Sequence, residues 1–157
     1  MKDVVKVYGF EMSRISEVYL STLSSMMSPQ GLERYFFALL YLCEHSGELT
    51  QKDLADAIRR DKVQTMRIVD YLCDKDLLVR KQDCTDRRCQ LLEVTDKAKA
   101  LVPKIKDGIA KTDDLLFHNF TSEEKAVFKA GMNKLFATIN TLPDPEFIVQ
   151  AYKRKNK

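Results

Sequence analysis

The sequence predicts a mainly α-helical protein that carries one short β-hairpin. Glycine occurs only five times and proline four times among 157 residues, whereas an all-β protein needs many more turn residues. Much of the chain spaces its apolar residues by three and four, as an amphipathic helix does. The longest apolar run, Tyr35 to Cys43, is too short to span a bilayer. We therefore expect a globular helical protein with no membrane partner.

Two segments near the N-terminus predict helices. From about Tyr8 to Met27, apolar residues recur at helical spacing and form one apolar stripe. The run Ser28-Pro29-Gln30-Gly31 then breaks the helix. The next segment, Leu32 to Glu44, is apolar nearly all round, which is typical of a helix that is buried on most of its surface.

Two short capped helices follow. Thr50 is a good N-cap with Asp53 three residues later, so a helix is expected from there to the connection Arg59-Arg60. Asp61 predicts the cap of a second helix. The predicted buried face of this second helix consists of Thr65, Ile68, Val69 and Leu72. Two short helices joined by so short a turn form a helix-turn-helix unit.

The hairpin follows directly. Lys75-Asp76 is expected to end the second short helix, because aspartate tolerates the left-handed backbone that a helix end requires. Residues 77–82 predict a strand, residues 83–88 a turn, and residues 89–94 a returning strand.

Two further helices complete the chain. Thr95 predicts the cap of a long helix to about Asn119, and Pro103 inside it leaves open whether this helix is kinked or restarted. A capping box at Thr121-Ser122-Glu123-Glu124 predicts a last helix to about Thr141.

The net charge of +3 is too small to indicate nucleic acid by itself, but it is unevenly spread. Residues 51–92 carry ten basic and eight acidic side chains, and the tail 152–157 carries four basic and no acidic ones. The chain opens without an apolar leader, so we expect a cytoplasmic protein whose four cysteines are reduced.

Neither metal nor catalytic chemistry is indicated. No CxxC motif occurs, and the two histidines lie far in sequence from Cys84 and Cys89, which predicts no metal site. We also find no glycine-rich phosphate loop and no His/Cys/Asp arrangement at catalytic spacing. The expectation is a protein that is not an enzyme and needs no cofactor.

Several short motifs occur together on these elements. They are Leu49-Thr50-Gln51-Lys52-Asp53-Leu54-Ala55, Asp61-Lys62, Leu77-Leu78-Val79-Arg80, Asp83-x-x-Asp86-Arg87-Arg88 and Leu92-x-Val94-Thr95. In this combination the sequence resembles the MarR family of winged helix-turn-helix regulators, over residues 32–100 by motif and elsewhere by helix layout. The resemblance implies a winged helix-turn-helix with a two- to three-stranded β wing, flanked by N- and C-terminal dimerisation helices.

The chain departs from the family pattern at three places. Arg59 occupies the inter-helix turn and Asp76 precedes the wing strand, where the family usually has glycine, so we expect strain in both turns. The recognition helix, which is the second helix of the unit, reads Val63-Gln64-Thr65 where the family favours Ser-Thr-Val. Its DNA sequence preference is therefore not inherited from the family pattern.

The resemblance implies a single MarR-like domain over residues 1–157. Residues 1–31 and 95–150 are the expected dimerisation helices, 32–94 the DNA-binding lobe, and 151–157 a basic tail. The protein would act as a homodimer, as a repressor on a pseudo-palindromic operator with half-sites about 10 bp apart. The apolar residues expected at the dimer interface are Val4, Val5, Val7, Tyr8, Leu135, Phe136, Ile139, Phe147 and Ile148.

A recognition helix reads base edges in the major groove from its N-terminal half. There Gln64 suits adenine, and Arg67 suits guanine or a phosphate. Val63 and Met66 suit thymine methyl groups, and nearby basic side chains suit phosphates. At the wing tip the resemblance implies that Arg88 enters the minor groove. The predicted DNA-binding residues are Arg60, Lys62, Val63, Gln64, Met66, Arg67, Tyr71, Asp86, Arg87 and Arg88.

Two regulatory hypotheses accompany this interpretation. The family often binds small phenolic or anionic effectors beside the DNA-binding lobe, and the lining residues expected here are Tyr8, Met12, Tyr19, Tyr35 and Phe36. Alternatively, a disulfide between Cys84 and Cys89 would bend the wing in a redox-responsive regulator, whereas Cys43 and Cys73 are expected to be inert. A further alternative is a winged-helix protein–protein interaction module that does not bind DNA.

Overall fold

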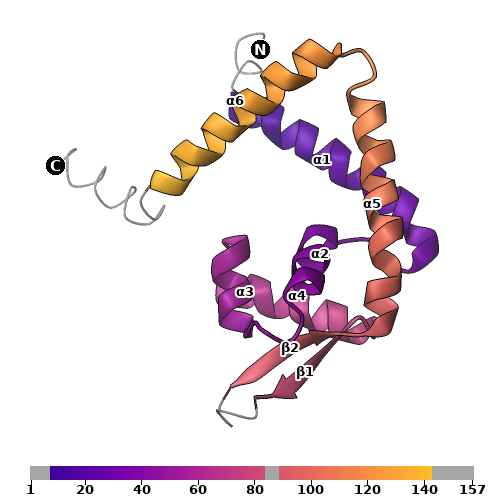
Figure 1. The fold of residues 1–157 in the computed structure, drawn as a ribbon, viewed down its shortest axis with the longest axis vertical. Coiled ribbons are helices and arrows are strands. Elements are labelled where there is room, and N and C mark those ends of the chain that lie inside the picture. Colours follow the sequence, from indigo (N-terminus) through magenta and orange to yellow (C-terminus); the bar gives the residue numbers. More distant parts are fainter. Residues whose placement is uncertain (1–7, 84–88, 143–157) are drawn as a thin grey trace, which may run out of the picture. The chain divides into compact units, whose positions relative to one another are not determined.

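The computed structural model describes residues 8–83 and 89–142, and the chain divides into two compact units between Leu116 and Phe117 (Figure 1). In order, the elements are α1 (Tyr8–Met27), the 3-10 helix η1 (Ser28–Gln30), α2 (Phe36–Glu44), α3 (Gln51–Ile58), α4 (Lys62–Asp74), β1 (Leu78–Gln82), β2 (Gln90–Val94), α5 (Asp96–Leu116) and α6 (Ser122–Thr141). The predicted mainly helical fold with one hairpin is confirmed. Within the described ranges, no helix is long and apolar enough to cross a membrane.

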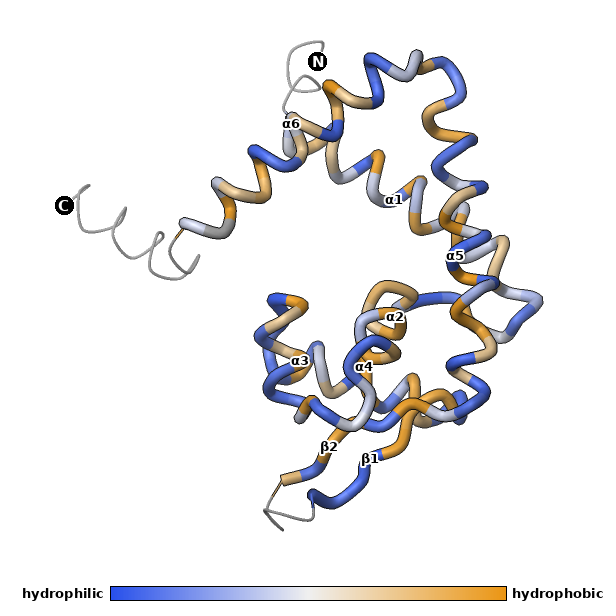
Figure 2. The backbone as a smooth tube through the Cα atoms, in the orientation of Figure 1, coloured by the Kyte–Doolittle hydropathy of each residue, from blue (hydrophilic) through white to orange (hydrophobic). Residues whose placement is uncertain are grey.

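A single hydrophobic core holds the first unit together. It combines the end of α1 with α2, Leu54 of α3, α4, the hairpin and the first half of α5, and burying each of its leucines stabilises the fold by about 2 kcal/mol. Helix α1 contributes only its C-terminal part, because Leu23 and Met27 are buried while Phe10, Ile15 and Val18 are exposed. Hydrophobic residues nevertheless recur along the whole of α1 (Figure 2).

Helices α1 and α5 cross closely at Gly108. A Cβ atom at this position would lie 3.0 Å from Cδ1 of the fully buried Leu23 and 3.5 Å from Sδ of Met27. Farther along the same pair of helices, the Tyr19 hydroxyl donates a hydrogen bond to Oδ1 of Asp113 at 2.9 Å. Partial burial and this carboxylate raise the pKa of Tyr19 to about 12.

The prediction of a helix from Leu32 is wrong, because α2 begins at Phe36. Leu32 is fully buried, but it lies in a connecting segment that ends at Tyr35 with a left-handed backbone, φ 64°. A helix cannot include such a residue. The apolar pattern does not reveal this, since a buried residue in a loop looks like a buried residue in a helix.

The long helix α5 is also shorter than predicted and ends at Leu116 instead of Asn119. After it, the Phe120 amide donates to the Phe117 carbonyl at 3.0 Å, and both rings pack against Phe128 of α6. This aromatic cluster favours a turn over another helical turn. Helix α5 is continuous through Pro103. Because proline has no amide N–H, the helix lacks the hydrogen bond that another residue at this position would donate to the Lys99 carbonyl.

Strands β1 and β2 form an antiparallel hairpin, paired from Leu78 opposite Val94 to Gln82 opposite Gln90. Only the start of β1 is buried, so the far part of β1 leaves the core and turns hydrophilic (Figure 2). The Leu92 amide also donates to the Leu49 carbonyl at 2.8 Å, and one bridge joins Thr50 to Leu91. The wing therefore has two strands, and the single β-bridge at Thr50 is all that is formed of a third strand.

The second unit is described from Phe117 to Leu142 and contains α6. The predicted capping box is confirmed, since the Glu124 amide donates to the Thr121 hydroxyl and the Thr121 amide donates to the Glu124 carboxylate. The predicted end at Thr141 is confirmed as well. Helix α6 exposes large apolar side chains, among them Val127, Leu135, Phe136 and Ile139.

Candidate nucleic-acid interface

Local hydrogen bonds determine where α3 and α4 begin. The Thr50 hydroxyl accepts from the Asp53 amide at 3.2 Å, and the Asp53 carboxylate accepts from the Thr50 amide at 2.9 Å. The Thr50 hydroxyl also donates to this carboxylate at 2.7 Å, and this bond together with that from the Thr50 amide holds the pKa of Asp53 below its usual range. Helix α4 begins in the same way, because the Asp61 carboxylate accepts from the Gln64 amide at 2.8 Å. The predicted helix-turn-helix unit is thus present with its predicted caps.

The four residues predicted to form the buried face of α4 are all buried: Thr65, Ile68, Val69 and Leu72. The other residues of α4 up to Asp70 are exposed and form two strips. The outer strip consists of Lys62, Val63, Met66 and Asp70, and the inner strip consists of Gln64 and Arg67. Val63 and Met66 are 53% and 45% exposed, so apolar side chains that make no core contact are presented to solvent beside basic ones.

Strand β1 is attached to α4 by an ion pair. The guanidinium of Arg80 lies 2.5 Å from Oδ1 of Asp70, and it also contacts Sγ of Cys73 at 3.7 Å. Farther out, Lys81 pairs with Glu93 across the hairpin at 2.9 Å. These contacts orient the hairpin against the recognition helix. The predicted wing-tip residues Asp86, Arg87 and Arg88 lie outside the described residues.

Tyr71 lies on the side of α4 that faces the segment before α2. Its hydroxyl accepts from the Glu33 amide at 3.2 Å, and its ring packs edge-on against Tyr35 with the centroids 5.3 Å apart. The guanidinium of Arg34 lies 4.9 Å from the Tyr71 ring centroid, within range of a cation–π interaction. Tyr71 therefore joins α4 to residues 33–35, and its predicted contact with DNA stays a prediction.

Comparison with known proteins agrees with this geometry. The model of the MarR family matches residues 33–90, which include α2, α3, α4 and β1 and end at the first residue of β2. Over 83% of this chain and 96% of the other, the structure is similar to that of MarR, at 25% identity and a TM-score of 0.74.

Residues 33–90 of the chain thus match the MarR family, and the described fold is similar to that of MarR-family structures. Two further solved structures are similar to this chain. MepR from S. aureus, solved in complex with DNA, is 22% identical over 85% of this chain and 96% of its own, with a TM-score of 0.71. CouR from Rhodococcus jostii, solved with p-coumaroyl-CoA bound, is 23% identical over 92% of this chain and 99% of its own, with a TM-score of 0.72.

The chain has a left-handed backbone at both positions where the MarR family pattern usually has glycine. Arg59 has φ 51° and Asp76 has φ 57°. Residues with a Cβ atom adopt this conformation at a cost of about 1 kcal/mol each. Hydrogen bonds keep both turns closed, since the Arg60 amide donates to the Ala55 carbonyl and the Leu77 amide donates to that of Leu72.

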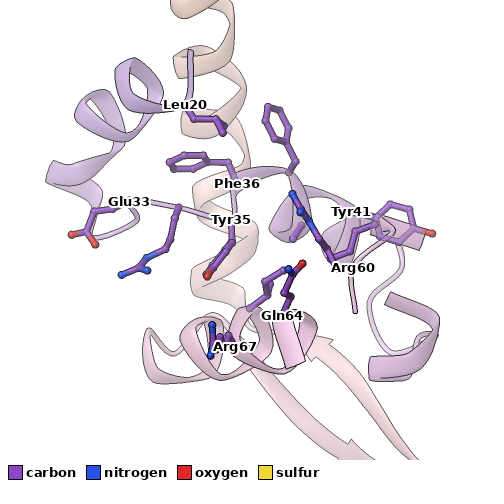
Figure 3. Close-up of a pocket in the computed structure, with 13 residues that line it drawn as sticks. Leu20, Glu33, Tyr35, Phe36, Tyr41, Arg60, Gln64 and Arg67 are labelled. Carbon is purple, nitrogen blue, oxygen red and sulfur yellow. The ribbon is translucent and has the colours of Figure 1, made fainter. Parts of the chain in front are cut away.

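A pocket of about 670 Å³ opens between α4 and the start of α2 (Figure 3). One wall consists of residues 33–38 with Tyr41, and the other contains Arg60, Gln64, Arg67 and Ile68. Leu20 and Ile58 complete the lining. The inner strip of α4 thus also forms part of a pocket.

The structure brings only some of the predicted effector-binding residues to this pocket. Tyr35 and Phe36 line it, whereas Tyr8, Met12 and Tyr19 are not among its lining residues. Sequence reasoning missed several lining residues, including Arg34, Phe37 and Tyr41. The only local sequence signal for these residues was the aromatic run after Arg34. Nothing local predicts that they lie opposite α4, because that position depends on how the helices pack.

The cysteines fall into two groups. Burial raises the pKa of the Cys43 and Cys73 thiols, which favours the protonated, less reactive form, and their predicted inertness stays a prediction. Cys84 lies outside the described residues, and the Cys89 carbonyl accepts from the Asp83 amide at 3.1 Å, so the redox hypothesis stays a prediction. Among the described residues, no group of three His, Cys, Asp or Glu side chains is placed to hold a metal ion.

Proposed function

We propose that this MarR family regulator is a non-catalytic, sequence-specific DNA-binding protein that acts as a homodimeric repressor on a pseudo-palindromic operator. The observation that carries the proposal is the exposed outer strip of α4, which presents Lys62, Val63 and Met66 beside a projecting hairpin. The MepR structure supports it, since that relative was solved in complex with DNA.

In this proposal α4 enters the major groove with its N-terminal half. Val63 and Met66 contact thymine methyl groups, while Gln64 and Arg67 bond base edges. Arg60 and Lys62 contact phosphates near the start of the helix, as Arg87 does at the wing. Arg88, oriented by Asp86, enters the minor groove. Arg80, paired with Asp70, positions the wing without touching DNA itself.

The dimer is proposed from the apolar surface that the described helices expose. On α1, Phe10, Ile15 and Val18 are about half exposed, and α6 exposes Phe136 and Ile139. Apolar surface of this extent is characteristic of an interface. Residues 1–31 and 95–150 are therefore proposed to form the dimer, with residues 32–94 as the DNA-binding lobe, so that two copies of α4 meet half-sites about 10 bp apart.

A small ligand is proposed to release the DNA. CouR was solved with p-coumaroyl-CoA bound, so a relative of the same fold takes an aromatic, anionic compound. In this chain the pocket beside α4 has the size of a small-molecule site, about 670 Å³.

The experiment that tests the proposal is selection from a random pool of short duplexes, followed by binding measurements at several salt concentrations. We expect a pseudo-palindromic site and a log–log salt slope steeper than about −4. The variant Arg88→Ala should weaken binding and flatten the slope, whereas Lys129→Ala on the exposed surface of α6 serves as a charge-matched control.

One observation favours a second candidate function, a winged-helix module for a protein partner. Val63, Met66 and Val79 are all about half exposed, and such an apolar surface also suits a protein. Weak, unselective DNA binding that Arg88→Ala leaves unchanged would exclude sequence-specific recognition of DNA. A protein partner for the same face of α4 would then be sought.

A further inference from the structure

A cluster of side chains around Tyr71 joins α4 to the segment that precedes α2. We call it the tyrosine cluster, and its members are Glu33, Arg34, Tyr35, Tyr71 and Lys75. The two tyrosine rings meet edge-on with their centroids 5.3 Å apart. The Tyr71 hydroxyl accepts from the Glu33 amide at 3.2 Å and lies 3.5 Å from Oε2 of Glu33, to which it donates. Aromatic contact and hydrogen bonding therefore act on the same side chain of α4.

Two cations lie over the Tyr71 ring. The guanidinium carbon of Arg34 is 4.9 Å from its centroid, and Nζ of Lys75 is 5.6 Å from it, so both are within range of a cation–π interaction. The Arg34 guanidinium is also 5.9 Å from the Tyr35 centroid, and Nζ of Lys75 lies 4.0 Å from the Glu33 carboxylate. Both cations thus have partners inside the cluster.

The cluster contains a strained residue. Tyr35 has φ 64°, a left-handed conformation that is unfavourable for a residue with a Cβ atom. Strain of this kind persists only where the surrounding contacts hold it, and it is concentrated at functional positions. The contacts that hold it here are those to Tyr71 and Arg34, which makes the cluster a candidate for a functional role.

Tyr71 shares a face of α4 with the inner strip. It follows Arg67 by four residues and Gln64 by seven, and such spacings lie on one side of a helix. Figure 3 shows the side chains of Gln64 and Arg67 rising from α4 on the side of Tyr35. The tyrosine cluster therefore holds α4 on the same side as its inner strip.

A second contact holds α4 from another direction. Asp70 precedes Tyr71 by one residue, so the two side chains leave the helix about 100° apart. Asp70 pairs with Arg80 on β1. Two lateral contacts in different directions restrict rotation of α4 about its own axis, and that rotation decides where Gln64 and Arg67 point.

We propose that Tyr71 is a positioning residue for DNA reading. The tyrosine cluster fixes the rotation of α4 so that Gln64 and Arg67 meet base edges, and neither Tyr71 nor Arg34 contacts DNA. The inference rests on the proposed DNA-binding function, adds what orients its reading residues, and gives Tyr71 an indirect role in place of the predicted contact. If only a fraction of the molecules holds the competent rotation, the apparent Kd for the operator rises by the reciprocal of that fraction.

Positioning and direct contact leave different signatures. If Arg34 bound a phosphate, its loss would reduce the log–log salt slope by about 0.9, because one counterion fewer is released. Loss of a positioning contact leaves the phosphate contacts of the bound state, and therefore the slope, unchanged. It weakens binding to the operator more than binding to an unrelated duplex, since base edges carry the sequence information and phosphates do not.

The experiment measures fluorescence anisotropy with a selected operator duplex and a scrambled duplex of the same composition, at several salt concentrations. We expect Tyr71→Leu to raise the Kd for the operator at least about tenfold, because it removes the ring contacts and a hydrogen bond together. Arg34→Ala should raise it about threefold, the size of one exposed cation–π interaction. Neither change should alter the salt slope. Lys106→Ala, an equal loss of charge at an exposed position of α5, should leave the operator Kd unchanged.

A double-mutant cycle shows whether Arg34 acts through the Tyr71 ring. Arg34→Ala should cause no further loss in the Tyr71→Leu background, because its partner is already absent. In the Tyr71→Phe background, which keeps the ring and loses only the hydroxyl, it should again cost about threefold. Thermal melts check that each variant is folded. Should Tyr71→Leu not fold, the salt slopes and duplex preferences of Arg34→Ala and Tyr71→Phe still decide between positioning and contact.

Several outcomes would overturn the inference. They are a salt slope flattened by about one in Arg34→Ala, equal weakening of both duplexes by Tyr71→Phe or Tyr71→Leu, and additive losses in the double variant. Failure of the proposed function looks different, because the wild type would then show no preference for the selected duplex at any salt concentration. The positioning role would be withdrawn together with the function in that case.

Discussion

At the residue scale, Gly108 has a role that its helical setting does not suggest. Glycine lowers helix stability, yet here its missing side chain allows α5 to approach α1. Leu23, the nearest neighbour, is fully buried and has little room to move. The close approach therefore depends on this residue having no Cβ atom.

We expect Gly108→Val to lower the free energy of unfolding by about 2 kcal/mol, because overpacking outweighs the gain in helix propensity. Urea unfolding followed by circular dichroism measures it. The control is Gly131→Val on α6, where no atom lies within 4 Å of an added Cβ. An unchanged or higher stability for Gly108→Val would show that the α1–α5 crossing accommodates the added side chain without a cost in free energy.

Some residue-level features could be predicted from the sequence and some could not. The left-handed turns at Arg59 and Asp76 followed from the comparison with the family pattern, since both replace a usual glycine. Tyr35 was not predicted, because nothing local marks a tyrosine for φ 64°. Packing of its ring against Tyr71 holds this conformation in the tertiary structure.

At the scale of the element, the start of α3 depends on one carboxylate. The hydrogen bonds from Thr50 keep the pKa of Asp53 below its ordinary value. A carboxyl whose pKa is lowered by folding adds stability above its unfolded pKa, and that contribution is lost as the pH falls through the folded pKa. The cap should therefore weaken in acid, below about pH 4.

The matching prediction compares Asp53→Asn with the wild type. The variant should be less stable at neutral pH, and the difference should shrink as the pH falls towards about 3. Thermal melts across this range measure it, with Asp56→Asn on the same helix as the control for net charge. A difference that stays constant with pH would mean that Asp53 ionisation does not support the cap. Thr50→Ala should cost about 1 kcal/mol at neutral pH.

Element boundaries were predictable where a cap defines them. The starts of α3, α4 and α6 follow from Thr50, Asp61 and Thr121, whose partners lie three residues away. The start of α2 and the end of α5 have no such signal. They are decided by contacts with residues elsewhere in the fold, such as Tyr71 for the segment before α2.

At the scale of the whole molecule, the proposed dimer gives the two operator half-sites their spacing. A charge placed in the apolar interface would have to be buried without a partner, which is strongly unfavourable. Phe136 on α6 is 56% exposed, so replacing it does not disturb a core.

We expect Phe136→Lys to shift the protein from dimer to monomer in sedimentation velocity and to weaken operator binding at least about tenfold, since one recognition helix makes too few contacts alone. Asn133→Lys adds the same charge at an exposed polar position of α6 and should leave the dimer intact. A dimer that persists in Phe136→Lys would place the interface elsewhere.

The helix-turn-helix, its caps, the buried face of α4 and the resemblance to the MarR family were all predictable from the amino-acid sequence, because each is encoded by residues within a few positions of one another. The set of side chains that shares the pocket was not predictable, because it depends on how distant elements pack together. Arg34 and Phe37 precede the helix-turn-helix, whereas Gln64 and Arg67 lie within it, and no periodic pattern specifies which faces of distant helices meet. That choice is made by the packing of α2 and α4 onto one core, where volume and shape across the whole fold are satisfied together.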